Sequence, residues 1–357
     1  MLKWPNVNAA IQPKPKLQTR NVFIDTCGFI NDNFGMTSTA FRSLFSLCRI
    51  GKAFLKLTDI TVRELDDHIS LEVTEAIKAH NGVMPKLKIL KNLDYQWLSH
   101  LFTPLRHDYL STALREKLQV EVKSAEAEIL PATKMSAEIV FRKYFDRKPP
   151  FGPAKKKAEF PDAFVVAALE AWCAEKGESI YVVSTDGDLQ SACGDNGPLL
   201  HLKSTAEFVD LVLREEDDEK AEFLAQLFID NPKPIIGAIT RQFEDRYVRL
   251  QDEDGDGEAS VVDVKLGSAA VVELQDSEAV LELDAEVSFT ASVSFRNPDM
   301  TWNSKHEDLE RTEWVPVEVR VKFDQNDHLN YEVISATVNN DESVGVYVDE
   351  EAERGWR

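Results

Sequence analysis

Two kinds of hydrophobic pattern divide the chain. In its first half, short apolar runs such as NVFID (21–25) precede stretches in which apolar residues recur every three or four positions, such as STAFRSLFSLCRIG (38–51). The same order returns at AFLKLTDI (53–60), SIYVVSTD (179–186) and LLHLK (199–203). Buried strands that alternate with helices are typical of a parallel sheet with helices on both faces. We therefore predict an α/β domain over residues 21–213.

A long segment inside this domain shows helical spacing only. Residues 84–147 carry apolar residues three and four apart in LREKLQVEVKSAEAEIL and in KMSAEIVFRKYF, and Pro131 separates the two stretches. Such spacing predicts amphipathic helices, and a proline ends a helix. We interpret the region of about 84–150 as a helical insertion. Residues 1–20, which contain several Pro and Lys residues, are interpreted as an N-terminal arm.

The second half begins with a further helix and then changes to a period of two. Residues 214–237 place four apolar residues on one helical face, which predicts a helical linker that packs against another element. In LELDAEVSFTASVSF (281–295) every odd position is apolar, and VPVEVRVKF (315–323) repeats the alternation. Strands with one buried and one solvent-exposed face are typical of antiparallel sheets. We predict an antiparallel, β-rich domain over residues 238–357, either a sandwich or a half-open barrel.

Charge separates the same two regions. The whole chain has 357 residues and a net charge of −21, but residues 1–205 sum to +3 and residues 206–357 to −24. The acidic balance therefore argues against nucleic-acid binding by the second half only. The acidic domain has three interpretations: a contact with a regulatory protein, a self-contact that restrains the first domain, or a solubilising module.

The cellular setting is inferred from what the sequence contains. No stretch approaches the roughly 18–20 uninterrupted apolar residues of a membrane helix, and the N-terminus does not resemble a signal peptide. The four cysteines form no CxxC pair, which favours reduced thiols and argues against a metal–thiolate site. We expect a cytoplasmic protein with no membrane contact.

Acidic residues follow the predicted strands of the first domain. Asp25 comes directly after the first strand, Glu64 shortly after the second, and Asp186 and Asp188 after SIYVVST, while Asp162 opens the apolar helix FPDAFVVAALEAW. Sites in open α/β sheets form at the carboxyl ends of the strands. Carboxylates packed together raise one another's pKa, and a bound cation relieves their repulsion. Oxygen-only ligands favour Mg²⁺ or Mn²⁺ as the cofactor.

Each of these acids also has a purely structural interpretation. Asp162 follows Pro161 at a helix start, where an Asp can cap the helix or complement its dipole, and Asp188 could equally cap the helix that follows it. Glu64 could be a solvated residue of a first helical turn. Asp25 is harder to explain in this way, because it ends a buried strand. We favour the metal-site interpretation for the set as a whole.

The acids and their surroundings resemble the PIN domain of metal-dependent nucleases. The resemblance covers about residues 21–212 and is carried, in order, by VFIDT, VREL, FPDAFVVAAL and STDGDL. It implies a small parallel sheet and a nuclease that cuts single strands, most often RNA. Metal ligands are implied at Asp25, Glu64, Asp162 and Asp186, with Asp188 as a frequent fifth catalytic acid. Two features depart from the family pattern: Cys27 stands where Asn or Ser is common, and the region 84–157 is longer than in compact members.

A basic segment leads directly to Asp162. Seven cations lie in FRKYFDRKPPFGPAKKKAEFPD (141–162): Arg142, Lys143, Arg147, Lys148, Lys155, Lys156 and Lys157. Four aromatic residues are interleaved with them: Phe141, Tyr144, Phe145 and Phe151. Cations contact phosphates and aromatic rings stack on unpaired bases, so we predict that this segment binds nucleic acid. The alternative is an ordinary solvated loop whose aromatic residues belong to the core.

The sequence leads to a functional hypothesis with two competitors. We expect a bacterial Mg²⁺- or Mn²⁺-dependent endonuclease that hydrolyses phosphodiester bonds of single-stranded RNA more readily than DNA; the resemblance adds a role as a toxin or phage-defence effector. One competitor is a catalytically inactive PIN-like module that binds nucleic acid or protein. The other is a phosphatase of the haloacid dehalogenase type, which needs a second Asp at the position that Cys27 occupies.

Overall fold

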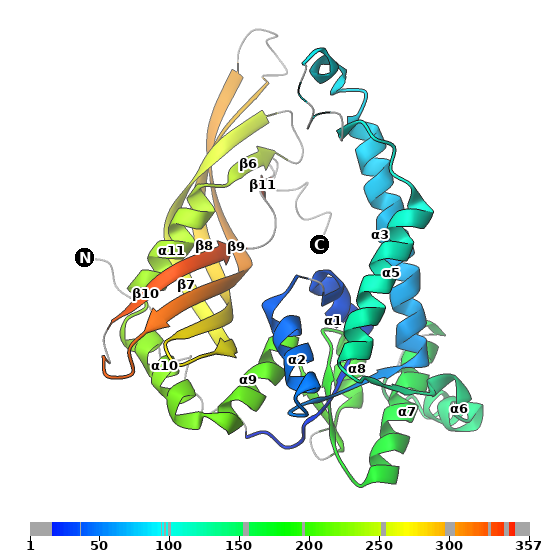
Figure 1. Ribbon diagram of the computed structural model, residues 1–357. Coiled ribbons are helices and arrows are strands. Elements are labelled where there is room, and N and C mark those ends of the chain that lie inside the picture. The colour runs from blue at the N-terminus through cyan, green and yellow to red at the C-terminus, as the bar shows by residue number, and fades with distance from the viewer. Residues whose placement is uncertain are drawn as a thin grey trace. The chain divides into compact units, whose positions relative to one another are not determined.

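The chain folds into two compact units, each built on its own sheet (Figure 1). One unit spans Leu17–Phe208, and the other combines Lys16 with the chain from Val209 onward. The computed structural model describes residues 16–35, 37–93, 95, 98, 101–152, 157–194, 197–250, 255–296, 304–327, 330–338 and 343–346. None of the described helices is both long enough and apolar enough to cross a membrane.

The described residues of the first unit form a five-stranded parallel sheet in the order β3-β2-β1-β4-β5. Its strands are β1 (Asn21–Ile24), β2 (Phe54–Thr58), β3 (Glu128–Leu130), β4 (Ile180–Val183) and β5 (Leu199–Leu202). Because every pair is parallel, all the carboxyl ends lie at one edge. The strand order reverses at β1, which has β2 on one side and β4 on the other. In open α/β sheets this reversal is the place where ligands bind.

Helices cover both faces of this sheet, which confirms the predicted α/β fold. They are α1 (Thr26–Asn31), α2 (Thr39–Arg49), α3 (Asp59–Val83), α5 (His107–Ser124), α6 (Ala137–Phe145), α7 (Phe160–Lys176) and α8 (Gly187–Ala192). Helix α9 (Thr205–Glu216) follows β5 and crosses the boundary between the two units. Short 3-10 turns are η2 (Asn33–Gly35), η3 (Lys88–Asn92), η4 (Ala132–Lys134) and η5 (Lys157–Glu159). Phe23 packs with Leu169 of α7, and Val22 and Ile24, whose side chains point to the opposite face, are just as buried.

The helical insertion is confirmed, but the prediction that residues 84–147 are wholly helical is wrong. Helices α3 and α5 lie side by side, and an ion pair joins Asp66 to Arg115 (Figure 1). Helix α5 ends at Ser124, and Glu126 turns the chain with a φ of 52°. The next residues form the edge strand β3, which pairs with β2. Three residues are too few to show an alternation of apolar and polar positions. The strand forms because these residues pair with β2, and the sequence pattern alone does not indicate it.

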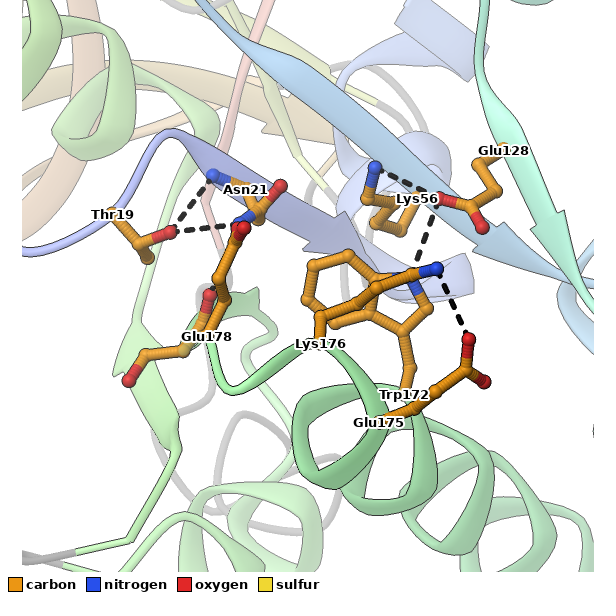
Figure 2. Close-up of polar contacts among 9 residues, drawn as sticks. Thr19, Asn21, Lys56, Glu128, Trp172, Glu175, Lys176 and Glu178 are labelled. Atoms are coloured by element: carbon orange, nitrogen blue, oxygen red, sulfur yellow. Dashed lines mark hydrogen bonds and ion pairs between the residues drawn. The ribbon is translucent and has the colours of Figure 1, made fainter.

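A buried lysine ties the sheet to α7 (Figure 2). Lys56 of β2 lies beneath the ring of Trp172, with its Nζ 5.0 Å from the ring centroid. The same Nζ is 3.0 Å from Oε2 of Glu128, and the Trp172 indole N–H donates to that oxygen at 3.3 Å. The Lys56 side chain is only 9% exposed. The Lys56 ammonium is therefore held by the carboxylate of Glu128 and by two aromatic rings, those of Trp172 and Phe54.

The second unit contains a six-stranded sheet, within the described residues, in the order β10-β9-β8-β7-β6-β11. Its strands are β6 (Tyr247–Leu250), β7 (Gly255–Leu274), β8 (Glu278–Arg296), β9 (Ser304–Phe323), β10 (Tyr331–Val338) and β11 (Ser343–Val346). Neighbours are antiparallel except β6 and β11, so the sheet is a mixed, mostly antiparallel half-barrel. The predicted alternation is confirmed, because the apolar positions of 281–295 and 315–323 are buried.

Two helices fill the inner side of this half-barrel. They are α10 (Asp218–Asp230) and α11 (Lys233–Glu244). The segment 214–237, which the sequence pattern assigns to a linker, contributes Leu224 and Ile235 to the core of the second unit. The ring of Phe243 on α11 lies 4.9 Å from that of Phe289 on β8, centroid to centroid. The apolar side of the sheet is therefore closed by helices instead of by a second sheet.

The ion pair of the buried Lys56 with the half-exposed Glu128 should matter more for stability than a pair in which both partners are exposed. We expect Lys56→Ala to lower the free energy of unfolding by about 2 kcal/mol, because it removes packing against Trp172 and leaves Glu128 without its cation. Lys176→Ala is the matched control: its Nζ is also 3.0 Å from a carboxylate, that of Glu175, but its side chain is 46% exposed. Urea unfolding of both variants measures the difference, and equal shifts of the midpoint would contradict this prediction.

Candidate active site

Asp25 lies at the carboxyl end of the central strand of the parallel sheet. It is 9% exposed, and its backbone N–H donates to the carbonyl oxygen of Val183 on β4 at 3.0 Å. Its Oδ2 accepts hydrogen bonds from the Ser184 hydroxyl at 3.0 Å and from the Cys27 thiol at 2.9 Å. Asp25 precedes α1, but its side chain makes no capping hydrogen bond to that helix. A capping role therefore does not explain why this strand ends on an acid.

Ser184 connects Asp25 to the acids that follow β4. It is fully buried, and its Oγ accepts a hydrogen bond from the backbone N–H of Asp186 at 3.0 Å. Asp186 in turn caps α8, because its Oδ1 accepts from the backbone N–H groups of Asp188 and Leu189 at 2.7 and 3.0 Å. The capping interpretation considered for Asp188 thus applies to Asp186, while Asp188 lies in the first turn of α8.

Glu64 approaches the same edge from α3. Its Oε2 accepts a hydrogen bond from the hydroxyl of Thr26 at 2.7 Å. Thr26 is buried and directly follows Asp25 in the chain. Glu64 is only partly exposed, so it is not the freely solvated residue of the alternative interpretation. The hydrogen bond holds the carboxylate of Glu64 next to the end of β1.

Asp162 shows that several carboxylates share one electrostatic environment. It lies in the first turn of α7 and is partly buried. Burial raises the pKa of Asp162 from about 3.8 to about 8, together with the charge of Asp25, a hydrogen bond with Glu159, and the charges of Glu159 and Glu64. The fold therefore brings Asp25, Glu64 and Asp162 together, although they are up to 137 residues apart in the chain.

The oxygen atoms of this cluster suit a hard divalent cation, but the side chains are turned toward protein donors. Among the residues that the structure describes, no three His, Cys, Asp or Glu side chains are placed to hold a metal ion together. Asp25 faces Ser184 and Cys27, while Glu64 faces Thr26. Carboxylate ligands and the mutual repulsion seen at Asp162 fit Mg²⁺ or Mn²⁺. Coordination by all three acids would require them to turn from their present partners.

Cys27 keeps a hydrogen-bond donor at the position where the sequence departs from the PIN pattern. Burial raises the pKa of the Cys27 thiol, and the charge of Asp25 raises it further. The protonated thiol donates to Asp25, and its Sγ accepts from the backbone N–H and the hydroxyl of Thr185, both at 3.4 Å. All four cysteines of the chain are free.

The predicted nucleic-acid-binding cations differ in their surroundings. Lys143 donates to both carboxylate oxygens of Glu170 at 2.7 and 2.8 Å, and Arg142 pairs with Glu138 at 3.0 Å. Lys148 is 67% exposed and lies 3.8 Å from Asp146, and Arg147 adopts a left-handed φ of 56°. Lys157 begins η5, while Lys155 and Lys156 lie outside the described residues. Arg142, Lys143 and Lys148 are therefore each paired with an acidic side chain of the same domain.

Three polar residues of the site escaped the sequence analysis. Ser184 follows a buried strand within VVSTD, and Thr26 follows Asp25, so both occupy the strand ends where the acids were sought. Glu159 is the N-cap residue of α7 and lies three positions before Asp162. Its spacing of one helical turn from a candidate ligand could have identified it.

One comparison with known proteins bears on this site. Residues 22–189 match the family model of the PIN domain. The match begins in β1 and ends in α8, so it contains all five candidate acids and the helical insertion. It does not extend into the second unit. Neither a search of curated proteins nor a search of solved structures found a match.

The raised pKa of Asp162 predicts a pH-dependent effect on stability. Between about pH 4 and pH 8 the folded protein keeps a proton on Asp162 that the unfolded chain releases, so stability falls as the pH rises through this window. Asp162→Asn removes that dependence. In EDTA we expect the variant to melt a few degrees above the wild type at pH 7.5 and at the same temperature at pH 4.

A divalent cation should raise the stability of the folded protein, whereas ionisation of Asp162 lowers it. Because a cation bound among the acids stabilises only the folded state, Mn²⁺ should raise the melting temperature of the wild type more than that of Asp162→Asn. Glu170→Gln serves as the control and should respond to Mn²⁺ like the wild type. Glu170 lies on α7, as Asp162 does, but its carboxylate is paired with Lys143 of α6. A variant at Asp162 that melts below the wild type in EDTA at pH 7.5 would contradict the electrostatic interpretation.

Proposed function

We propose that the PIN domain matched by residues 22–189 is a metal-dependent endonuclease that hydrolyses phosphodiester bonds in single-stranded RNA. The family match indicates a nuclease-type fold. The observation that carries the proposal is the electrostatic coupling at Asp162, whose pKa is raised by burial and by acids from β1 and α3. Perturbed carboxyl groups at the carboxyl edge of a parallel sheet are a common feature of active sites.

In this proposal Asp25, Glu64, Asp162 and Asp186 would hold Mg²⁺ or Mn²⁺. Asp188, in the first turn of α8, would assist as the fifth catalytic acid. When bound, the cation supplies a Lewis acid for the phosphodiester oxygens and lowers the pKa of water. Without the cation, the hydroxyl groups of Ser184 and Thr26 donate to Asp25 and Glu64 and hold them at this edge. To bind the cation, both acids would turn from these hydroxyl groups, so the chain's own contribution is to gather the charges at one edge.

The substrate assignment rests on the basic segment next to Asp162. Arg142, Lys143, Arg147, Lys148, Lys155, Lys156 and Lys157 precede the helix that bears Asp162. Contacts between cations and phosphates do not depend on base identity, so they place a strand at the site without selecting its sequence. The preference for RNA over DNA comes from the PIN resemblance.

A second candidate function is a catalytically inactive PIN-like module that binds nucleic acid or protein. The observation that favours it is the hydrogen-bonding of the acids, because Asp25, Glu64 and Asp186 all accept from donors of the protein itself. In such a module these contacts would serve the fold alone. The presence of every candidate acid at one edge favours the nuclease.

The proposal also includes a cellular location and a biological role. We place the protein in the bacterial cytoplasm, as a toxin or phage-defence effector, on the PIN resemblance. Residues 238–357 would then provide an acidic surface for a regulatory protein or for a contact that restrains the nuclease. Their negative charge makes them unsuited to bind the substrate themselves.

Cleavage assays with two kinds of nucleic acid test the proposed function. We expect the purified full chain to cut labelled single-stranded RNA in Mn²⁺ or Mg²⁺ and not in EDTA. Asp25→Asn should lower the rate by at least a hundredfold, because it removes a charge that the cation requires. Asp146→Asn, an acid of the basic segment, should cut like the wild type. If the purified protein binds the metal but cuts neither RNA nor DNA, the result would support the inactive module.

Salt dependence tests the basic segment. Replacing Lys155, Lys156 and Lys157 by Ala should weaken RNA binding and reduce the slope of log K against log salt by about 2, given roughly 0.7 for each phosphate contact on a single strand. Lys176→Ala is the control and should change the slope little, because Lys176 ends α7 and lies outside the basic segment. Fluorescence anisotropy in EDTA measures both, and an unchanged slope for the triple variant would remove this segment from the interface.

A further inference from the structure

Two aromatic side chains of the basic segment stay at the surface while the others enter the core. Tyr144 and Phe151 pack edge to face with centroids 5.1 Å apart, and both belong to the cluster that joins α6 to α7. Phe141 and Phe145 are 46% and 65% exposed. One helical turn apart on α6, their rings are stacked, with centroids 6.2 Å apart and an angle of 26° between planes. The core therefore does not account for this pair.

The exposed pair is connected to the candidate active site by ring contacts. The ring of Phe141 lies 5.2 Å from that of Phe160, centroid to centroid. Phe160 is the first residue of α7, two positions before Asp162. A ligand that rests on the pair is thereby held at a defined place relative to the helix start that carries Asp162.

The charges around the pair indicate what kind of ligand it binds. Arg142 and Lys148 are each more than 65% exposed at the end of α6 and in the turn that follows, where Arg142 pairs with Glu138 and Lys148 with Asp146. Flat aromatic faces beside exposed cations suit a ligand with flat rings and negative charges. Unpaired bases on a phosphate backbone have both features, whereas the bases of a duplex are already stacked on one another.

We infer that Phe141 and Phe145 form a stacking platform for unpaired bases of the strand that the nuclease cuts. This inference rests on the proposed function, which it deepens by assigning the contact that distinguishes single strands from duplexes. Base stacking depends on the flat π-face of the ring, so it should tolerate any base but not the loss of aromaticity. The cations of the segment bind phosphates independently of this contact.

Substitutions at Phe145 separate stacking from simple apolar contact. Anisotropy of a labelled single-stranded uridine oligonucleotide is measured with the full chain in EDTA, where cleavage does not interfere. We expect Phe145→Ala and Phe145→Leu each to weaken binding about tenfold, and Phe145→Trp to bind like the wild type. The salt slope should stay unchanged in all three. Tyr109→Ala, at a 72% exposed aromatic residue of α5, is the control and should bind normally.

The outcomes distinguish this inference from the proposed function. If the wild type binds the oligonucleotide and Phe145→Ala binds equally well, the platform is wrong and the nuclease proposal stands. Wild-type affinity in Phe145→Leu would also overturn stacking, because leucine keeps the apolar surface but not the ring. An abasic oligonucleotide with the same phosphates should bind the wild type and Phe145→Ala alike; a difference between them would point to an apolar contact other than base stacking. If the wild type binds no nucleic acid at all, the proposed function fails together with the platform.

Discussion

Repulsion between carboxylates at one edge of the parallel sheet is the physical constraint that defines the candidate site of the first unit. Asp25, Glu64 and Asp162 come from β1, α3 and α7, so their proximity is a consequence of the whole fold and not of one local motif. Like charges near one another and partly removed from water favour protonation, as the raised pKa of Asp162 shows. The hydroxyl groups of Ser184 and Thr26 offset part of that cost by donating to Asp25 and Glu64.

The acidic side chains of the two units lie in different environments. In the second unit the acids alternate with apolar residues along β8 and β9, so they lie on the wet side of the half-barrel. Glu282 and Glu318 are even directly opposite each other across the two strands. Water screens such pairs, and their cost stays small. In the first unit Asp25, Glu64 and Asp186 are partly or largely buried, and each accepts a hydrogen bond from a specific donor of the protein. This contrast is why we assign chemistry to the first unit and not to the second.

Sequence pattern predicted the elements whose burial is periodic and missed those that arise from pairing or from partners distant in the chain. The alternation over 281–295 and 315–323 identified the inward residues of these two stretches, since one face of each is buried. Strand β3 has three residues and depends on β2, so no period could indicate it. Asp25 was found because a charge at the end of a buried strand is unusual. Glu159 and Ser184 were not, because their roles follow from the approach of α7 and β4 to β1.

The central claim is that these carboxylates form one site for a divalent cation. An anomalous difference map from crystals of the full chain soaked in Mn²⁺ tests it most directly. The account predicts a peak among the carboxylates of Asp25, Glu64 and Asp162, with their side chains turned from Ser184 and Thr26 toward the ion. No peak at this edge, with the acids still bound to those hydroxyl groups and Mn²⁺ bound elsewhere or not at all, would contradict it.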